Sequence, residues 1–312
     1  MEKAYAGIKK NQLVPGHYYA DENYNVLTLG WDQAWKYMSG GYVGNNNLES
    51  YMKLGYVPID EVVDATAKTL EYAYDDWCVA QLAKALGKED DYKLLMERSS
   101  NYKNVFDPSV NAMRGKHSDG TWLEPYQPLS GKGFAEGISG WQYIWFVPHD
   151  VQGLINLFGG RDKFNEKLNW GFEQAVHQDF RGGNNAYLYH GQQSDMQVGW
   201  LFNYSGKPWL TQKWVREIMA RAYGITPEDG YPGDEDQGQM GAWYVLSAMG
   251  LFEVNGGAGV EPVYEIGSPI FDKVTIWLDS QYYKPLTPKG EGETPSPLMG
   301  EGEGEHYTRT LT

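Results

Sequence analysis

Three consecutive acidic side chains, Asp234, Glu235 and Asp236, stand in a Gly/Pro turn that leads directly into the apolar segment "GQMGAWYVLSAMG". Like charges at this spacing repel one another, so their placement at the start of a helix needs a physical reason. Carboxylates in such a cluster can hold a divalent cation, or they can activate a water molecule as a general base. The turn is therefore the first candidate for a reactive site.

Simpler explanations account for part of this acidic turn. Asp236 can cap the helix that follows by accepting backbone N–H bonds at its positive end. A calcium loop of the EF-hand type is excluded, because the fifth and twelfth positions counted from Asp234 are Gly238 and Val245 rather than oxygen ligands. On these residues alone, a solvated acidic turn and a catalytic or cation-binding cluster both remain open.

A series of helices must position this turn. Segment 64–87 has apolar residues at helical spacing and ends at Gly87, and segment 89–108 follows as its antiparallel partner, ending before Pro108. Further helices are predicted at 148–160, 161–177, 194–206, 208–224 and 237–250. Because no fixed period links them, they favour a closed helical bundle or an α/α toroid. The longer loops, where function usually lies, are 107–141, 178–196 and 224–237.

The C-terminal part of the chain contains a segment with strand-like patterning, followed by a segment rich in Pro, Gly and Glu. The stretch "KVTIWLDS" (273–280) alternates like a β-strand, and residues 251–269 offer another candidate strand. From residue 285 onward Pro, Gly and Glu dominate, and too few apolar residues remain to offset chain entropy. The prediction is a mainly α chain, with part of an α/α toroid over 1–250, a short β element over 251–284 and a disordered tail over 285–312.

Composition narrows the class of ligand. The 312-residue chain has a formal net charge of −15 and scattered basic residues, which disfavours binding to nucleic acid or to an anionic membrane. A single cysteine, Cys78, excludes an internal disulfide. No apolar run is long enough for a membrane span, and the first residues lack the apolar core of a secretory signal. The 12 Trp and 24 Tyr suit the faces of neutral sugars, although such rings also build ordinary cores.

The stretch "PGDEDQGQMGAWYVLSAMGLFEV" resembles the signature of glycoside hydrolase family 92, which comprises calcium-dependent, exo-acting α-mannosidases that invert the anomeric centre. Four other stretches agree with the family, in the family's order, and together they cover most of residues 50–280: "KLGYVPID", "KTLEYAYDDWCVAQLAKALGK", "EGISGWQYIWFVPHDVQGLINLFGG" and "LFNYSGKPWLTQKWVREI". The resemblance implies an (α/α)6 toroid that hydrolyses terminal α-linked mannose from glycans.

The resemblance also implies the catalytic pair. Glu136 matches the family's general acid, and Asp236, with Asp234 beside it, matches the base that orients the attacking water. Inversion places two such carboxyl groups about 6.5 to 9.5 Å apart, on opposite faces of the sugar. Aromatic residues surround Glu136 in the sequence, and an apolar environment disfavours the ionised form, as a general acid requires. Without the resemblance, Glu136 would read as a surface carboxylate in a Gly-rich loop.

A calcium ion is the cofactor that the resemblance implies, in contact with the O2 and O3 hydroxyls of mannose. Calcium takes hard oxygen ligands. The candidates are the Glu235 carboxylate and Met196, which lies in the segment "QSDMQ", whose backbone carbonyls and carboxylate are also candidate ligands.

Four residues are candidates for binding the substrate itself: Trp141, Gln192, Gln193 and Asp195. Gln192 and Gln193 stand where α-1,2-specific relatives carry a His-Glu pair that grips the leaving sugar. Because that carboxylate is replaced by an amide, an α-1,2 preference is not expected.

The extent of the chain adds a further expectation. Members of the family are roughly twice as long and carry an N-terminal β-sandwich, so this chain is expected to begin inside the toroid and to pair with that missing N-terminal portion. Two alternatives remain: an inactive carbohydrate-binding fragment of such an enzyme, or another α/α-toroid enzyme such as a polysaccharide lyase. The family usually acts outside the cytoplasm, and the sequence itself assigns no compartment.

Overall fold

The computed structural model describes residues 1–15, 17–18, 42–43, 45, 47–134, 138–181, 186–233, 235, 238–279 and 306–311. Helices dominate these residues, and the short strands within them pair two by two. The prediction of a mainly α chain is therefore confirmed. Closure into an (α/α)6 ring and the domain boundaries stay predictions. Within the described part of the chain, no helix combines the length and apolar character needed to cross a membrane.

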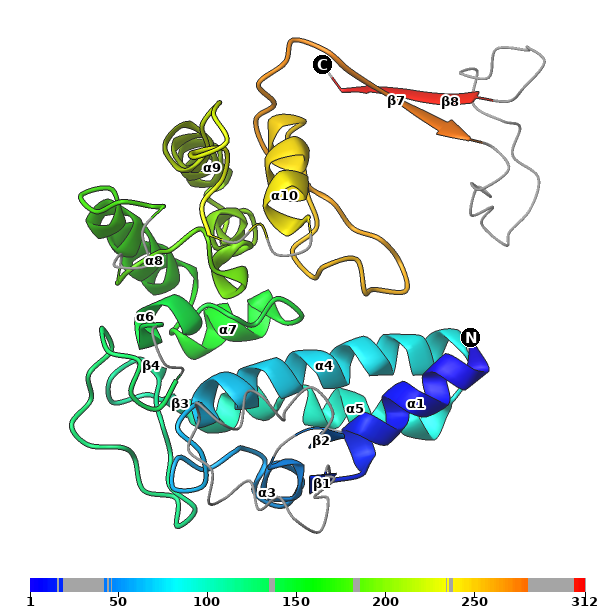
Figure 1. The fold of residues 1–312 in the computed structure, drawn as a ribbon, viewed down its shortest axis with the longest axis vertical. Helices are drawn as coiled ribbons and strands as arrows, with labels where there is room; N and C mark the ends of the chain where they lie inside the picture. Colours follow the sequence, from blue (N-terminus) through cyan, green and yellow to red (C-terminus); the bar gives the residue numbers. More distant parts are fainter. Residues whose placement is uncertain are drawn as a thin grey trace.

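One group of helices forms the lower part of the molecule in Figure 1: α1 (Glu2–Leu13), α3 (Leu48–Leu54), α4 (Ala65–Ala85) and α5 (Glu89–Arg98). The predicted apolar stripe of α4 is buried, with Leu70 and Ala80 at 0% exposure. The helix ends as predicted at Gly87, which has φ +69°, while the Lys88 N–H donates to the Ala83 carbonyl at 2.8 Å. A left-handed glycine at this place lets the chain reverse so that α5 packs along α4.

The second predicted helix, 89–108, is shorter than expected. It ends at Arg98 and is followed by the 3-10 helix η2 (Asn101–Val105) and by β3 (Phe106–Asp107), which pairs with β4 (Ala112–Met113). Ser99 and Ser100 cause the early end, because their hydroxyls donate to the carbonyls of Met96 and Glu97 and satisfy the last turn locally.

The second group of helices continues through the middle and upper part of Figure 1: α6 (Gly140–Tyr143), α7 (Val151–Leu157), α8 (Arg161–Ala175), α9 (Pro208–Ala222) and α10 (Gln239–Ala248). Four of them match the helices predicted at 148–160, 161–177, 208–224 and 237–250. Their shared core is aromatic, and Trp145 stacks on Phe158 at 5.2 Å while Phe164 stands perpendicular to it at 5.6 Å. This core extends from Tyr56 to Val254.

The prediction of a continuous α-helix at 194–206 is wrong. The structure has two 3-10 helices there, η3 (Gln193–Asp195) and η4 (Val198–Asn203). The Gln197 side-chain amide donates to the Ser194 carbonyl at 2.8 Å, and that carbonyl is the acceptor that a continuous α-helix would have used for the Val198 N–H.

The C-terminal strands partly match expectation. β5 (Leu251–Phe252) pairs with β6 (Glu265–Ile266), and β7 (Val274–Asp279) pairs antiparallel with β8 (His306–Leu311), extending away from the helices in Figure 1. β8 lies in the tail over 285–312 for which disorder is predicted, and the disorder of that tail stays a prediction. The sequence of β8, "HYTRTL", is aromatic and β-branched, a composition that favours strands. Two further short strands, β1 (His17–Tyr18) and β2 (Tyr42–Val43), pair near the N-terminus.

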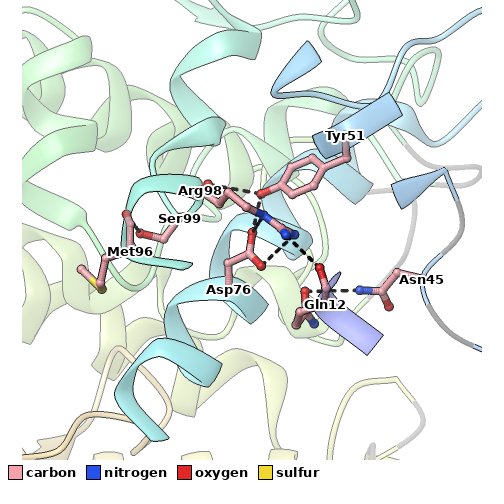
Figure 2. A network of polar contacts seen from close by, with 7 residues as sticks. All are labelled: Gln12, Asn45, Tyr51, Asp76, Met96, Arg98 and Ser99. Carbon is pink, nitrogen blue, oxygen red and sulfur yellow. Dashed lines mark hydrogen bonds and ion pairs between the residues drawn. The ribbon is translucent and has the colours of Figure 1, made fainter. Parts of the chain in front are cut away.

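A buried ion pair ties the first helical group together (Figure 2). The Arg98 guanidinium contacts both carboxylate oxygens of Asp76 at 3.0 Å, and the Tyr51 hydroxyl donates to the same carboxylate at 3.0 Å. Arg98 Nη1 also donates to the carbonyl of Gln12, in the last turn of α1, at 2.8 Å. Four helices, α1, α3, α4 and α5, thus converge on one charge pair.

Candidate active site

The predicted catalytic residues Glu136, Asp234 and Asp236 lie outside the described residues. The described residues that flank them are 134 and 138 on the two sides of Glu136, and 233, 235 and 238 around Asp234 and Asp236. Phe134 is buried, and a Cβ on Gly140 would meet its ring at 2.6 Å. The two sides of the loop around Glu136 are therefore closed on one another.

Ser139 anchors the C-terminal side of that loop. Its hydroxyl accepts the Gln142 N–H, and the Gln142 side chain accepts the Ser139 N–H, which completes a capping box at the start of α6. The same hydroxyl donates to the Ala186 carbonyl. Loop 107–141 is thereby joined to loop 178–196.

Two contacts join loop 178–196 to the turn that carries the acidic triplet. A Cβ on Gly233 would stand 2.6 Å from the Gly191 carbonyl oxygen, so the two backbones pass in direct contact. Arg181 Nη1 donates to the Asp229 carbonyl at 2.7 Å. The three loops predicted to carry function, at 107–141, 178–196 and 224–237, therefore meet in one region.

Glu235 is the described member of the triplet, and it caps α10. Its carboxylate accepts the backbone N–H of Gly238, and the N–H of Gly241 at 3.1 Å. A negative charge at this end of the helix is favoured by the free amides and by the helix dipole. Glu235 adopts a left-handed backbone with φ +65°, which aims its side chain back at the helix. The sequence had predicted this capping role for Asp236, the next residue, which lies outside the described residues.

The candidate substrate residues of loop 178–196 differ in exposure. Gln193 is exposed, Gln192 is half-buried, and Asp195 is fully buried. The Asp195 carboxylate accepts the Tyr189 N–H at 2.8 Å, and burial raises its pKa well above the ordinary value. Its other oxygen has no hydrogen-bond partner among the described residues. Asp195 thus braces the loop on which the two glutamines are presented.

Met196 links this loop to α10. Its carbonyl accepts the indole N–H of Trp243 at 2.8 Å, and both residues border a pocket of about 340 Å³. The pocket has aromatic walls, including Phe252 and Tyr264, with polar groups from Gln239 and Glu253. This volume lies in the range of small-molecule sites, and the lining is mostly apolar.

Sequence reasoning missed His190, which lies in the centre of this region. His190 is fully buried and its Nε2 lies 2.9 Å from the Tyr223 hydroxyl, which itself donates to the Met240 carbonyl. Burial lowers the pKa of His190 to about 3, so the ring is neutral. Because the Tyr223 hydroxyl gives its own proton to the Met240 carbonyl, the tautomer that fits is the one in which Nε2–H donates to Tyr223. Trp243 packs on the ring at 4.1 Å. The only sequence signal was a histidine directly before Gly191.

A second missed group lies on α4, beneath α6. The Tyr143 hydroxyl donates to the Glu71 carboxylate at 3.3 Å, and Asp75 follows one helical turn later. Burial raises the pKa of Glu71 to about 7, with a further contribution from the charge of Asp75, and burial raises the pKa of Asp75 to about 6. Near neutral pH, Glu71 therefore exchanges between its protonated and ionised forms.

The described residues do not by themselves make a calcium site. No group of three or more His, Cys, Asp or Glu side chains within them is arranged to hold a metal ion. The Glu235 carboxylate already accepts two amide hydrogen bonds and the Met196 carbonyl accepts the Trp243 indole. Calcium needs six to eight oxygen ligands, so we assign no catalytic step to the ion.

Trp141, the remaining candidate for substrate binding, is the second residue of α6. It is half-buried and touches rings from two other parts of the chain, Trp170 of α8 at 5.2 Å and Tyr187 at 5.7 Å. Trp141 thus lies on the same side of α6 as the junction between Ser139 and Ala186.

Comparison with known proteins relates the chain to one family. Residues 1–292 match the family described as glycosyl hydrolase family 92 catalytic domain. A curated relative, an uncharacterized secreted glycosidase of Arthroderma benhamiae, is 29% identical over 264 residues, which cover 75% of this chain and 32% of the relative.

Solved structures give the same result. The GH92 α-mannosidase BT3965 of Bacteroides thetaiotaomicron, in complex with mannoimidazole, superposes with a TM-score of 0.70 at 35% identity, covering 88% of this chain and 33% of that one. The GH92 inverting mannosidase BT2199 of the same organism gives 0.69 at 33% identity, covering 88% and 36%. The chain thus spans about a third of the length of these relatives.

Proposed function

Because this chain belongs to glycosyl hydrolase family 92, we propose that it hydrolyses terminal α-linked mannose from glycans with inversion of the anomeric centre. The observation that carries the proposal is the junction of the three loops. Ser139 joins the end of the loop around Glu136 to Ala186, and Gly191 of that second loop touches Gly233, directly before Asp234. The segments that hold the proposed acid and the proposed base therefore border one region, although they are 100 residues apart in sequence.

In the proposed reaction Glu136 protonates the glycosidic oxygen as the leaving sugar departs. Asp236, with Asp234 beside it, takes a proton from a water molecule that attacks the anomeric carbon from the opposite face. One water is consumed and mannose leaves with inverted configuration. Glu136 ends ionised and Asp236 ends protonated, the reverse of their starting states. Solvent then restores their starting protonation.

Gln192 and Gln193 are proposed to contact the leaving group. Their amides are neutral donors and acceptors. Gln192 is half-buried and Gln193 is exposed, and both lie at the turn where loop 178–196 meets Gly233. Neutral amides fit a set of sugar hydroxyls without the strong preference that a charged pair would impose. Asp195 supports them from below through its bond to Tyr189.

Calcium dependence enters the proposal through the family. The ion would supply positive charge next to the mannose hydroxyls, and Glu235 and the Met196 carbonyl are the groups proposed to help hold it. Polysaccharide lyase chemistry receives no comparable support from the described residues, because His190 is fully buried and bonded to the half-buried Tyr223 rather than placed as an accessible base.

The test is release of mannose from an aryl α-mannoside by the purified chain, with added calcium and again with a chelator. We expect calcium-dependent release that is lost in Asp236→Asn and kept in Glu228→Gln, which changes an exposed carboxylate in the same loop. Full activity of Asp236→Asn would refute the proposed base. Absence of release from folded parent protein would refute hydrolysis by this chain and favour carbohydrate binding without turnover.

A further inference from the structure

An exposed tryptophan stands beside the junction of the proposed catalytic loops. Trp170, on α8, is 43% exposed although it is a large apolar residue. Its ring lies 5.2 Å from that of Trp141 and 5.4 Å from that of Tyr187, and these two rings are 5.7 Å from each other. Three rings from three separate segments therefore form one cluster, and Trp170 is its exposed member.

The backbone of α8 is adapted to this cluster. Gly171 lies in the interior of the helix, where glycine costs about 1 kcal/mol relative to alanine. A Cβ at this position would stand 2.8 Å from Trp141 Nε1, so the missing side chain makes room for the indole. Lys167, one turn earlier, places its ammonium 5.4 Å from the centre of the Trp141 ring and donates to the Asn111 carbonyl. Trp141 is thus held firmly against α8.

The cluster is continuous with the proposed active site. Tyr187 follows Ala186, whose carbonyl accepts the Ser139 hydroxyl, and Trp141 follows Ser139 by two residues. The contact that joins the loop of Glu136 to loop 178–196 therefore also fixes two of the three rings.

The polar surroundings of Trp170 suit a pyranose. Glu166 and Gln174 lie one helical turn before and after it, on the same side of α8, and Glu166 is exposed while Gln174 is half-buried. The C–H face of a pyranose packs on an indole, and a carboxylate and an amide at its edge can bond its hydroxyl groups. With a net charge of −15 on the chain, a neutral sugar is favoured over an anionic one.

We propose that Trp170, held in place by Trp141 and Tyr187, is the platform of a subsite that binds a second, neutral pyranose of the glycan, on the leaving-group side of the proposed catalytic centre. Its position in the reaction rests on the proposed function. The binding itself requires only the ring cluster. Because neighbouring rings fix the platform before the sugar arrives, little conformational entropy is lost when the sugar binds.

The test is equilibrium binding of α-linked mannobioses and of mannose, measured by calorimetry in an Asp236→Asn background so that no ligand is consumed. Trp170→Ala should weaken binding of at least one mannobiose about tenfold, since roughly half an indole is covered by a stacked sugar, and should weaken mannose binding less. The matched control is Trp209→Ala, which removes a 58% exposed tryptophan on α9 and should bind like the parent. Gly171→Ala should reproduce the loss by displacing Trp141, and thermal melts verify that each variant is folded.

The outcomes separate the two proposals. Equal mannobiose binding by Trp170→Ala and Trp209→Ala would overturn the subsite, whatever the activity of the chain. A tenfold loss in Trp170→Ala from a chain that releases no mannose would refute hydrolysis and support the subsite. Failure of the parent to bind any mannobiose would overturn the subsite as well.

Discussion

Gly233 and Gly191 pass so closely that a methyl group on the first would stand 2.6 Å from the carbonyl oxygen of the second. Gly233 also has φ +65°, a conformation that residues with a Cβ rarely adopt. The turn that carries the acidic triplet is therefore seated on the loop that carries the two glutamines. Two glycines create this contact, and neither contributes a functional group.

Gly233→Ala is expected to displace the turn and to lower mannose release at least about tenfold, since a shift of about 1 Å in a catalytic group can cost more than that. Gly87→Ala is the matched control, because Gly87 has φ +69° but no atom near its would-be Cβ. Both variants should lose about 1 to 2 kcal/mol of stability from the left-handed backbone, and only the first should lose activity. Equal activities in the two variants would show that the contact with Gly191 does not position the base.

Ser139→Ala should destabilise the protein by about 1 to 2 kcal/mol, because it removes the capping box of α6 together with the bond to Ala186. Urea unfolding monitored by circular dichroism measures the change. Ser100→Ala removes an exposed hydroxyl bonded to a carbonyl within its own turn, and it should cost less than about 0.5 kcal/mol. A cost for Ser139→Ala as small as the control's would mean that the junction of the two loops is not held by this hydroxyl.

Elements whose signals are local could be predicted from the sequence. The apolar stripe of α4 and the left-handed Gly87 that ends it lie within one segment, and the structure has both where they were expected. The family resemblance was likewise visible in continuous stretches such as the one that begins α10. The early end of α5 was missed, because two serine hydroxyls compete with the helix for its last carbonyls.

Contacts between distant segments could not be predicted in the same way. The sequence around Ser139 does not indicate its hydrogen bond to Ala186. The sequence around Glu71 likewise does not indicate its hydrogen bond with Tyr143, 72 residues later. The choice of Glu235 as the capping carboxylate depends on its left-handed backbone, which the acidic triplet alone does not reveal. The roles of Glu136, Asp234 and Asp236 stay predictions, because these residues lie outside the described part of the chain.

The raised pKa of Glu71 should make the free energy of unfolding fall as the pH rises towards neutrality. Its pKa in the folded protein is raised to about 7 from the ordinary value of 4.5, chiefly by burial. The folded state therefore holds a proton that the unfolded state releases, so the stabilisation is full below about pH 4.5 and is lost as the pH rises through 7. Glu71 should contribute a fall of up to about 3 kcal/mol across this window in urea unfolding at several pH values. Glu71→Gln should remove that share and leave the part due to Asp75 and Asp76, whose pKa values are also raised by burial.

Tyr143→Phe provides the companion test for Glu71. The Tyr143 hydroxyl favours the ionised carboxylate, so its removal should raise the pKa of Glu71 further and move the fall in stability to higher pH. A parent whose pH dependence matches that of Glu71→Gln would show that Glu71 ionises normally in the folded protein.

The Arg98–Asp76 pair should matter far more to stability than the exposed ion pairs do. Burial raises the pKa of Asp76 to about 7 even though Arg98 favours its charge, so removing the guanidinium leaves a fully buried carboxyl with one hydroxyl partner, Tyr51. Arg98→Met is therefore expected to cost about 3 to 5 kcal/mol, and Asp76→Asn combined with it should cost less than the sum of the single changes. Urea unfolding measures both.

Lys9→Met is the control for this prediction, because Lys9 contacts Asp91 at 2.6 Å but its side chain is 38% exposed. This substitution should lower the free energy of unfolding by no more than about 1 kcal/mol. Because Arg98 also bonds the Gln12 carbonyl, its loss should speed hydrogen exchange in the last turn of α1, whereas Lys9→Met should not. If the two variants unfold at the same urea concentration, the convergence of four helices on this charge pair contributes little to stability, and the apolar contacts of Tyr5 with α4 and α5 hold α1 instead.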